Sequence, residues 1–454
     1  MALSRIWAAF IIISVLVAGI KYAFFANDRD IFSTMVTGKS GDTIRVKTAV
    51  VPVVTAVQSG QPAPPKVSAN FRIQNANGII ETCNTAVTLS IGLIGIMALF
   101  MGLMSIAEQA GGIRFLSRIV GPFFSKLFPE LPKGHPAMGH MVMNFSANLL
   151  GLDNAATPFA LKAMDSLQEL NPNKDTASNT QIMFLCLHQS GLQLIPVTVI
   201  ALRASAKVAD PTDLFIPIVI ATFVTTIASM CIVSYRQKIN IFQPVILLWV
   251  GALSAIIAGI VIYLHTLNAD GIQSFSRALG NGLILLIFFL IVTGAVYKRI
   301  NIFDAFVQGA KGGFETAIRI IPYLVGMLVA ISMLRTSGTF DVIINGLKHL
   351  FTSLGTDTRF VDGLPTALIK PLSSAGARGM LVDTMQTFGK DSFAARLSGI
   401  LQGSSESTFY VVAVYFGSIS VRNTRYAISS MLLADLVSIL TSIFLCYMFF
   451  GHIQ

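Results

Sequence analysis

The sequence predicts an all-α polytopic membrane protein, and three observations lead to that fold class. Hydrophobic residues make up 54% of the 454 residues and charged residues only 12%, with a mean hydropathy of +0.71, a balance that soluble globular chains do not show. The apolar residues gather in about nine runs, each near the ~20 residues needed to cross the hydrocarbon core. The basic residues fall mostly between these runs.

The expected transmembrane helices follow in chain order. They are residues 6–25, 84–106, 183–202, 214–234, 242–264, 282–296, 317–334, 397–416 and 428–450. The first is taken as a retained span, because it is nearly long enough to cross and shows no convincing small-residue cleavage site. Residues 26–79 are polar and rich in proline, which predicts an extracytoplasmic insert with some strand.

The net charge of +10 is attributed to membrane topology and not to nucleic-acid binding. Basic groups follow the second, fourth, sixth and eighth spans, on one side of the membrane if every run crosses once. They are Arg114, Arg118, Lys126 and Lys133; Arg236 and Lys238; Lys298 and Arg299; and Arg422 and Arg425. The positive-inside rule predicts a bacterial cytoplasmic (inner) membrane protein with a cytoplasmic N-terminus and an extracytoplasmic C-terminus. The exceptions are Arg203, Lys207, Lys348 and Arg359.

The chain repeats one plan. Residues 84–87 with Gly95 resemble residues 315–318 with Gly326. Each half continues through an amphipathic segment expected at the interface, then an interrupted apolar region, then a polar knot that enters a span. The predicted topology gives the halves opposite orientations, and inverted repeats with broken helices are typical of secondary transporters.

The predicted domains follow from this plan. They are a first helix (1–25), the insert (26–79), a first repeat (80–205), linking helices (206–300) and a second repeat (301–454).

The interrupted region of the first repeat, 143–164, contains Gly151 and Pro158 and predicts a re-entrant hairpin with freed backbone groups at its tip. Its polar side chains suit a sugar, a base edge or another small polar ligand. They are Asn144, Ser146, Asn148, Asp153, Asn154 and Thr157. The alternatives are a polar surface loop, and for Asp153 an N-cap role.

The second repeat offers an equivalent hairpin around residues 364–380 and a polar knot at 402–410. Two cations beside a Ser- and Gly-rich turn suit a carboxylate or phosphate, unless they snorkel to the outer interface. The substrate-binding candidates here are Lys370, Ser373, Ser374, Arg378, Gln402, Ser404 and Ser405, with Gln189 and Ser190 in the matching knot of the first repeat.

Glu406 and His188 are the candidate ion-coupling residues. A buried glutamate has a raised pKa and can exchange a proton near neutral pH, and histidine titrates in the same range. The alternatives are an ion pair of Glu406 with Lys370 or Arg378, a structural His188, and coupling to sodium through freed carbonyls.

Five stretches also carry a family resemblance. MNFSANLLGLDNAATPFALKAM and LQELNPNKDTASN resemble the spore maturation protein A family, and FETAIRIIPYLVGMLVAI, IKPLSSAGARGM and LQGSSESTFYVVAVYFG resemble the spore maturation protein B family. The resemblance covers 84–202 and 303–445, as in a fusion of two proteins usually encoded separately. These families have nucleoside-recognition (gate) domains, similar to parts of nucleoside transporters and of the ferrous iron permease. The resemblance implies an integral membrane transporter or gate.

No enzyme, cofactor or metal site is expected. HExxH, GxSxG, Walker and GxGxxG motifs are absent, and the four cysteines form no CxxC.

The predicted function is secondary-active transport, by alternating access and coupled to protons, of a small polar or anionic solute such as a nucleoside-like compound or a small organic anion. The alternatives are a gated channel and a membrane scaffold that recruits envelope enzymes through the insert. Lipid is the expected surrounding, and a dimer or higher homo-oligomer is expected by analogy with related gate domains.

Overall fold

The computed structural model describes residues 2–24, 30–38, 46–48, 70–72, 78–132, 134–151, 153–267 and 269–453. These residues are almost entirely helical, which confirms the predicted all-α class. Within the insert, helix α2 (Ile31–Thr37) and a pair of short antiparallel strands, β1 (Val46–Thr48) and β2 (Asn70–Arg72), are described, with Val46 opposite Arg72.

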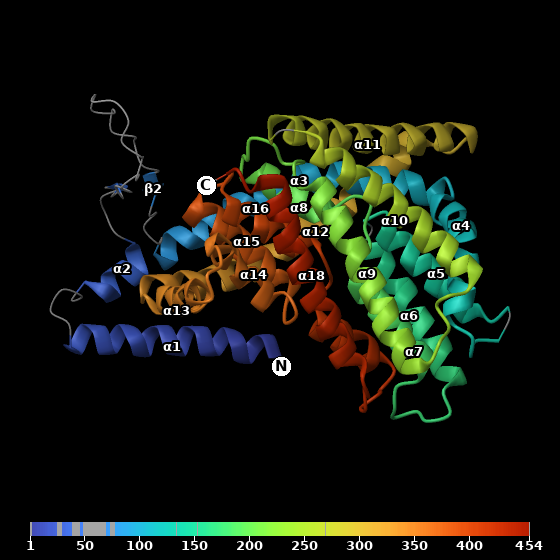
Figure 1. The fold of residues 1–454 in the computed structure, drawn as a ribbon, viewed down its shortest axis with the longest axis horizontal. Helices are drawn as coiled ribbons and strands as arrows, with labels where there is room; N and C mark the ends of the chain where they lie inside the picture. Colours follow the sequence, from blue (N-terminus) through green and yellow to red (C-terminus); the bar gives the residue numbers. More distant parts are fainter. Residues whose placement is uncertain are drawn as a thin grey trace, which may run out of the picture.

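The remaining helices follow in chain order (Figure 1). They are α1 (Ala2–Phe24), α3 (Ile79–Gln109), α4 (Gly112–Leu127), α5 (Pro136–Leu149), α6 (Asp153–Leu170), α7 (Asn179–Ser190), α8 (Val197–Ser205), α9 (Phe215–Gln237), α10 (Pro244–His265), α11 (Ala269–Tyr297), α12 (Ile302–Thr336), α13 (Thr339–Ser353), η2 (Arg359–Gly363), α14 (Leu364–Ile369), α15 (Ser374–Phe388), α16 (Phe393–Gly403), α17 (Thr408–Val411), η3 (Val412–Phe416) and α18 (Ala427–Phe450).

Six described helices are long and apolar enough to cross a membrane, and they coincide with six of the nine predicted spans. They lie in α1, α3, α9, α10, α11 and α18. The seventh predicted span corresponds to α12, whose shorter apolar part is Leu324–Thr336 and which begins at Ile302, well before the predicted start. The two remaining predicted spans, 183–202 and 397–416, are each interrupted near their middle.

Helices α3 and α12 pack along each other and carry the repeated motif of residues 84–95 and 315–326. Their contact depends on close backbone approach: a Cβ at Gly309 would lie 2.3 Å from the carbonyl oxygen of Met101. The two long helices of the repeats therefore form one shared element of the core.

The interrupted spans run antiparallel to each other. The first consists of α7 and α8, and the second of α16 followed by α17 and η3. The start of α7 lies beside the end of the second span, since Thr176 and Asn423 form a backbone bridge. The end of α8 lies beside the start of α16, because Arg203 and Arg396 both bind Asp213. The two repeats are therefore inverted relative to each other.

Each repeat also contains a helical hairpin, α5–α6 in the first and α14–α15 in the second. The base of α6 leads into α7, and the base of α15 leads into α16. Because α7 and α16 begin at opposite ends of the antiparallel pair, the hairpins enter from opposite ends and their tips approach the middle.

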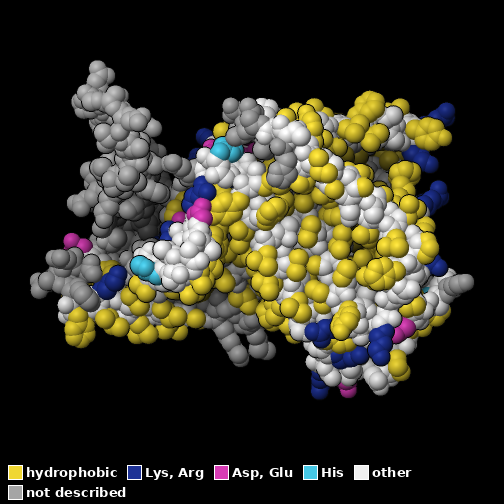
Figure 2. Space-filling view, in the orientation of Figure 1, with side chains coloured by type: hydrophobic (Ala, Val, Ile, Leu, Met, Phe, Trp, Pro, Cys, Tyr) yellow, Lys and Arg dark blue, Asp and Glu magenta, His cyan; other side chains and the backbone are white. Residues whose placement is uncertain are grey.

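The surface is largely apolar in the view of Figure 2, where dark blue Lys and Arg side chains gather along the right and lower right edges. Those edges are formed in Figure 1 by α4, α6, α7 and one end of α11. Helices α1, α10 and α11 are the most exposed of the six apolar helices, with 11%, 6% and 11% of their apolar segments buried. Lipid facing these helices accounts for their composition.

Three of the four basic residues that are exceptions to the charge bias form ion pairs. The ammonium or guanidinium group of each lies within 2.9 Å of a carboxylate oxygen: Arg203 of Asp213, Lys348 of Asp362, and Arg359 of Asp357. Arg203 is fully buried. The positive-inside rule counts Lys and Arg and is not a net-charge rule, so these residues remain exceptions to the bias.

Candidate functional site

The first broken span is interrupted at residues 191–196, between α7 and α8, and the second at residues 404–407, between α16 and α17. The two breaks lie against each other, at a place called the crossing below, and their backbones are hydrogen-bonded directly. The amide N–H of Glu406 donates to the carbonyl oxygen of Gln189 over 2.7 Å. The side-chain amide of Gln189 donates to the carbonyl oxygen of Glu406 over 3.2 Å. Backbone groups that a continuous helix would satisfy internally are thus paired across the repeats.

Each hairpin tip is hydrogen-bonded to the break of its own repeat. Leu194 N–H donates to Leu149 O over 2.8 Å, and Phe409 N–H donates to Pro371 O over 2.9 Å. The first tip needs glycine, because Gly151 has a φ of +73° and a Cβ there would lie 2.6 Å from the carbonyl oxygen of Ile195. The same pair of contacts in both halves brings the two tips to one crossing.

A carboxylate that the sequence analysis did not select lies at this crossing. Asp435 of α18 is 4% exposed. Its Oδ1 accepts from Gln189 Nε2 over 2.7 Å and from Ser405 Oγ over 3.0 Å, and its Oδ2 accepts from Thr408 Oγ1 over 2.7 Å. Asp435 thus joins both breaks to the last span.

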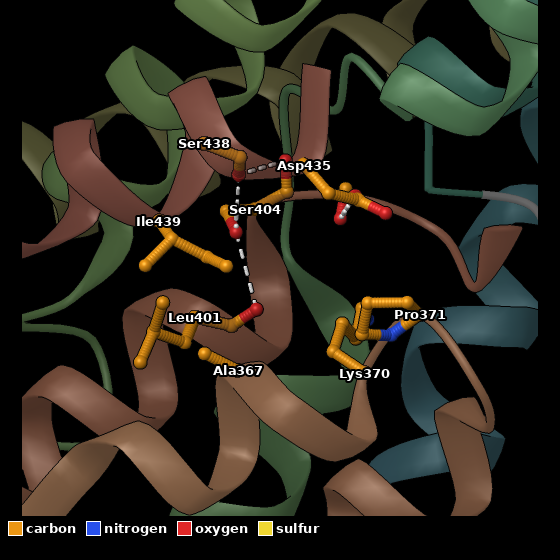
Figure 3. Close-up of a pocket in the computed structure, with 9 residues that line it drawn as sticks. Ala367, Lys370, Pro371, Leu401, Ser404, Asp435, Ser438 and Ile439 are labelled. Atoms are coloured by element: carbon orange, nitrogen blue, oxygen red, sulfur yellow. Dashed lines mark hydrogen bonds between the residues drawn. The ribbon is translucent and has the colours of Figure 1, made fainter. Parts of the chain in front are cut away.

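Beside Asp435 lies a cavity of about 10 Å³, which is room for one water molecule. Figure 3 shows Asp435, Ser404 and Ser438 on one wall and Lys370 with Ala367 on the opposite wall. Ser438 Oγ donates to Ser404 Oγ over 2.8 Å. Lys370, from the tip of the second hairpin, thus faces Asp435 across this cavity.

Lys370 is 5% exposed and donates from Nζ to the carbonyl oxygen of Gln402 over 2.5 Å. The alternative that this side chain snorkels to the interface is therefore wrong.

Two serines at the start of α15 make local contacts. Ser373 caps α15 by accepting from Gly376 N–H. Ser374 Oγ lies 2.7 Å from Ser407 Oγ and donates to Glu406 Oε2 over 3.3 Å. Glu406 is half-buried, less enclosed than Asp435.

The first repeat contributes a cluster of amides and one imidazole. His188 Nδ1 lies 3.0 Å from Asn144 Oδ1 and 3.0 Å from Asn148 Nδ2. Asn144 Nδ2 donates to Ala156 O over 2.8 Å, which joins the two arms of the hairpin. The ring of Tyr415 packs edge-on against His188 at 4.9 Å between centroids. The cluster holds the first hairpin against α7 and against η3 of the other repeat.

The structure thus joins the predicted residues into one polar region, with some exceptions. The predicted residues that lie at the crossing, or in the hairpins and helix ends packed against it, are Asn144, Asn148, His188, Gln189, Lys370, Ser373, Ser374, Gln402, Ser404, Ser405 and Glu406. Ser190 instead pairs with Thr226 of α9 at 2.9 Å, and Ser146 lies 3.4 Å from Ser117 of α4. Thr157 and Arg378 are half-buried on α6 and α15. The side chains of Asp153 and Asn154 lie outside the described residues, so neither the site prediction nor the cap alternative is addressed for them.

Two buried acceptors at the crossing have no hydrogen-bond partner among the described residues: the side-chain oxygens Oε1 of Gln189 and Gln402. These residues are 0% and 5% exposed. An unpaired buried carbonyl is unfavourable, so the pair favours a ligand that donates hydrogen bonds. Among the described residues, no group of three or more His, Cys, Asp or Glu side chains is arranged to hold a metal ion.

The comparisons with known proteins agree with this geometry. The nucleoside-recognition (Gate) family profile matches residues 90–242 and 317–422, which contain both hairpins and both breaks. The chain belongs to the Gate family. As a Gate protein it presents the matched region twice, once in each inverted repeat.

Two relatives of this Gate protein come from Bacillus subtilis (strain 168). Spore maturation protein A is 42% identical over 173 residues, which are 37% of this chain and 88% of the relative. Spore maturation protein B is 43% identical over 154 residues, which are 34% of this chain and 85% of the relative. No solved structure matches the chain.

Asp435 escaped the sequence analysis although a signal for it exists. It is the one acidic or basic residue in the 24 residues of α18. A single carboxylate in an otherwise apolar span is costly unless it is satisfied internally. The polar knots carry several polar side chains each, and this denser pattern outweighs the single charge of α18 in the sequence.

Proposed function

We propose that this protein is a secondary-active transporter of a small polar solute of nucleoside-like chemistry, working by alternating access between its inverted repeats. The observation that carries the proposal is the crossing, where two antiparallel broken helices bind each other and two hairpin tips arrive from opposite ends. Such a site can be reached from either side if one hairpin at a time moves away.

The proposed solute contacts follow from the groups left available at the crossing. Gln189 and Gln402 offer carbonyl acceptors without a partner among the described residues. The hydroxyls of Ser374 and Ser405 donate to Glu406 and Asp435, and each keeps oxygen lone pairs that can accept from a solute. This chemistry suits the hydroxyls of a sugar and the amino or imino edge of a base better than a purely anionic solute. Arg378, on the second turn of α15, is the proposed contact for a negative group on solutes that carry one.

The proposed surroundings are the bacterial cytoplasmic membrane, with the N-terminus in the cytoplasm. The basic groups that follow the second, fourth, sixth and eighth predicted spans support this orientation. We propose proton coupling, since two carboxylates, Glu406 and Asp435, lie at the crossing.

The test is transport by the purified full-length protein in liposomes. Liposomes preloaded with unlabelled uridine or adenosine and diluted into the labelled nucleoside should show saturable counterflow that protein-free liposomes lack. The Gln189→Leu variant should lower it, and Ser190→Ala, whose hydroxyl binds Thr226 away from the crossing, is the matched control. Flux that never saturates and that ignores Glu406→Gln would instead identify a gated channel.

A scaffold function makes a different prediction. In that case, deleting residues 26–77 should abolish the cellular phenotype of the protein, and substitutions at the crossing should leave it intact. Counterflow that is unaffected by the deletion but lost in the Gln189→Leu variant supports transport.

A further inference from the structure

The carboxylate of Asp435 is the most enclosed acidic group at the crossing, and its partners come from three different elements. Gln189 belongs to the end of α7, Ser405 to the second break, and Thr408 to the start of α17. None of these donors is charged. A change in the charge of Asp435 therefore acts at once on both broken helices and on the last span.

The two oxygens of this carboxylate differ in what they can accommodate. Oδ1 is bound by the amide N–H₂ of Gln189, which donates and cannot accept. Oδ2 is bound by the hydroxyl of Thr408, which can reverse and accept. A proton on Oδ2 is thus tolerated without moving any heavy atom, and Oδ1 keeps its donors.

The charged surroundings are few. Lys370 faces the same cavity from the second hairpin, Glu406 comes from the second break, and His188 from α7. Helices α9 and α16 also pack along α18 and bring Arg236 and Arg396 only near their ends, and α11 brings no charged group among its described side chains. Lys370 is therefore the cation that shares a cavity with Asp435 among the described residues.

We propose that Asp435, and not Glu406, is the carboxylate that binds the coupling proton. Protonation removes the negative charge of Asp435, which attracts the ammonium of Lys370 across the cavity, and so releases the tip of the second hairpin. This inference rests on the proposed transport function and specifies its coupling. The proton passes from hydronium on one side to Oδ2, forming one O–H bond, and leaves to water on the other side. The one-water cavity beside Lys370, Ser404 and Ser438 is its point of entry.

The structure also explains why a sodium ion is not favoured here. The cavity holds the ammonium of Lys370 on one wall, and this cation would repel a second one at close range. A proton adds no volume and neutralises the carboxylate without competing for space.

The first test needs no substrate. Infrared spectra of the full-length protein in lipid nanodiscs are recorded while the pH is lowered, and the carbonyl stretch of a protonated carboxylic acid is followed. Because the chain has 22 Asp and Glu residues, the contribution of Asp435 is read from the difference between the wild-type and Asp435→Asn spectra. We expect one difference band with a single midpoint, and the same band when Glu406→Gln is compared with the Glu406→Gln, Asp435→Asn double variant. Absence of a difference band overturns the proposal.

The second test uses transport and separates the two claims. Asp435→Asn should lose about a hundredfold of the uridine uptake driven by a pH gradient, as expected when a positioned proton carrier is removed, while it keeps counterflow that needs no net proton movement. Uptake driven by a sodium gradient, or unchanged gradient-driven uptake in Asp435→Asn, overturns the inference. Absence of counterflow in the wild type contradicts the transport proposal instead, and the infrared result then stands alone.

A third variant serves if Asp435→Asn fails to fold. Asp435→Glu keeps a titratable group one methylene further from α18 and should shift the midpoint of the infrared band. An unshifted midpoint in Asp435→Glu overturns the proposal.

Discussion

In the first repeat, the polar side chains nearest the crossing are the amides of Asn144 and Asn148 and the imidazole of His188. In the second repeat, the charged side chains nearest the crossing are those of Lys370, Glu406 and Asp435. The backbone contacts of the two hairpin tips are nevertheless the same. The comparison teaches that geometry is shared between the repeats and charge is not.

The asymmetry extends along the second hairpin. Arg335 of α12 binds Asp383 of α15, with Nε 2.7 and 2.8 Å from the two carboxylate oxygens, and its guanidinium packs over the ring of Phe340. No such ion pair joins α5 or α6 to α3 among the described residues. The second hairpin is therefore the one whose position responds to charge, and the first is held by neutral contacts.

The largest effect should follow from breaking the charged anchor of the second hairpin. Arg335→Leu leaves Asp383 buried without its partner, and we expect a loss of about 3 to 5 kcal/mol in the free energy of unfolding. Unfolding of the purified protein in detergent measures it. The control is Asp357→Asn, which breaks a half-exposed pair with Arg359 and should cost about 1 kcal/mol or less. Equal losses in the two variants would contradict the special position of the second hairpin.

Removing the charge at the second tip should affect function more than stability. Lys370→Met deletes the ammonium that binds Gln402 O and faces Asp435. Gradient-driven uptake should therefore fall by about tenfold or more, which corresponds to about 1.4 kcal/mol or more of the transport barrier. Lys348→Met, on the half-exposed pair with Asp362, is the control and should transport normally. A Lys370→Met variant with wild-type uptake would remove the functional asymmetry between the hairpins.

The first repeat should respond less. Asn148→Ala removes one neutral hydrogen bond to His188, which is worth about 1 kcal/mol. The melting temperature should fall slightly, and the pH dependence of uptake should keep its midpoint. A displaced midpoint would show that the first repeat also takes part in coupling.

The smallest effect is expected at Ser374. Its hydroxyl contacts Ser407 at 2.7 Å and Glu406 at 3.3 Å, and Ser374→Ala should cost about 0.5 to 1.5 kcal/mol, seen as a several-fold rise in the half-saturating nucleoside concentration. Ser353→Ala, whose hydroxyl is exposed and binds its own helix, is the matched control. Equal half-saturation in both variants would exclude Ser374 from the solute site.

The sequence was sufficient for the helical fold and for the inverted plan, because both depend on local signals. Apolar runs give the spans, and Gly151 and Pro158 give the first hairpin. The polar knots were visible in the sequence, but 183–202 and 397–416 were predicted as unbroken spans, and the structure interrupts both. The hydrogen bonds that satisfy these breaks join residues more than two hundred positions apart.

Side-chain partners were the part that sequence could not supply. Asp435 lies in a helix with no other charge, and its significance comes from Gln189, Ser405 and Thr408 around it. Arg203 likewise stood only as an exception to the charge bias, and the structure shows it buried and paired with Asp213. In both cases the decisive fact is which distant residue occupies the adjacent space.

The most direct test of transport at the crossing is a structure of the full-length protein determined in lipid nanodiscs with uridine or adenosine present. We expect the hairpin tips at Leu149 and Pro371 to enter from opposite membrane faces. The nucleoside should lie between them, within hydrogen-bond distance of Gln189 or Gln402. Tips entering from the same face, or a nucleoside bound away from the crossing, would contradict it.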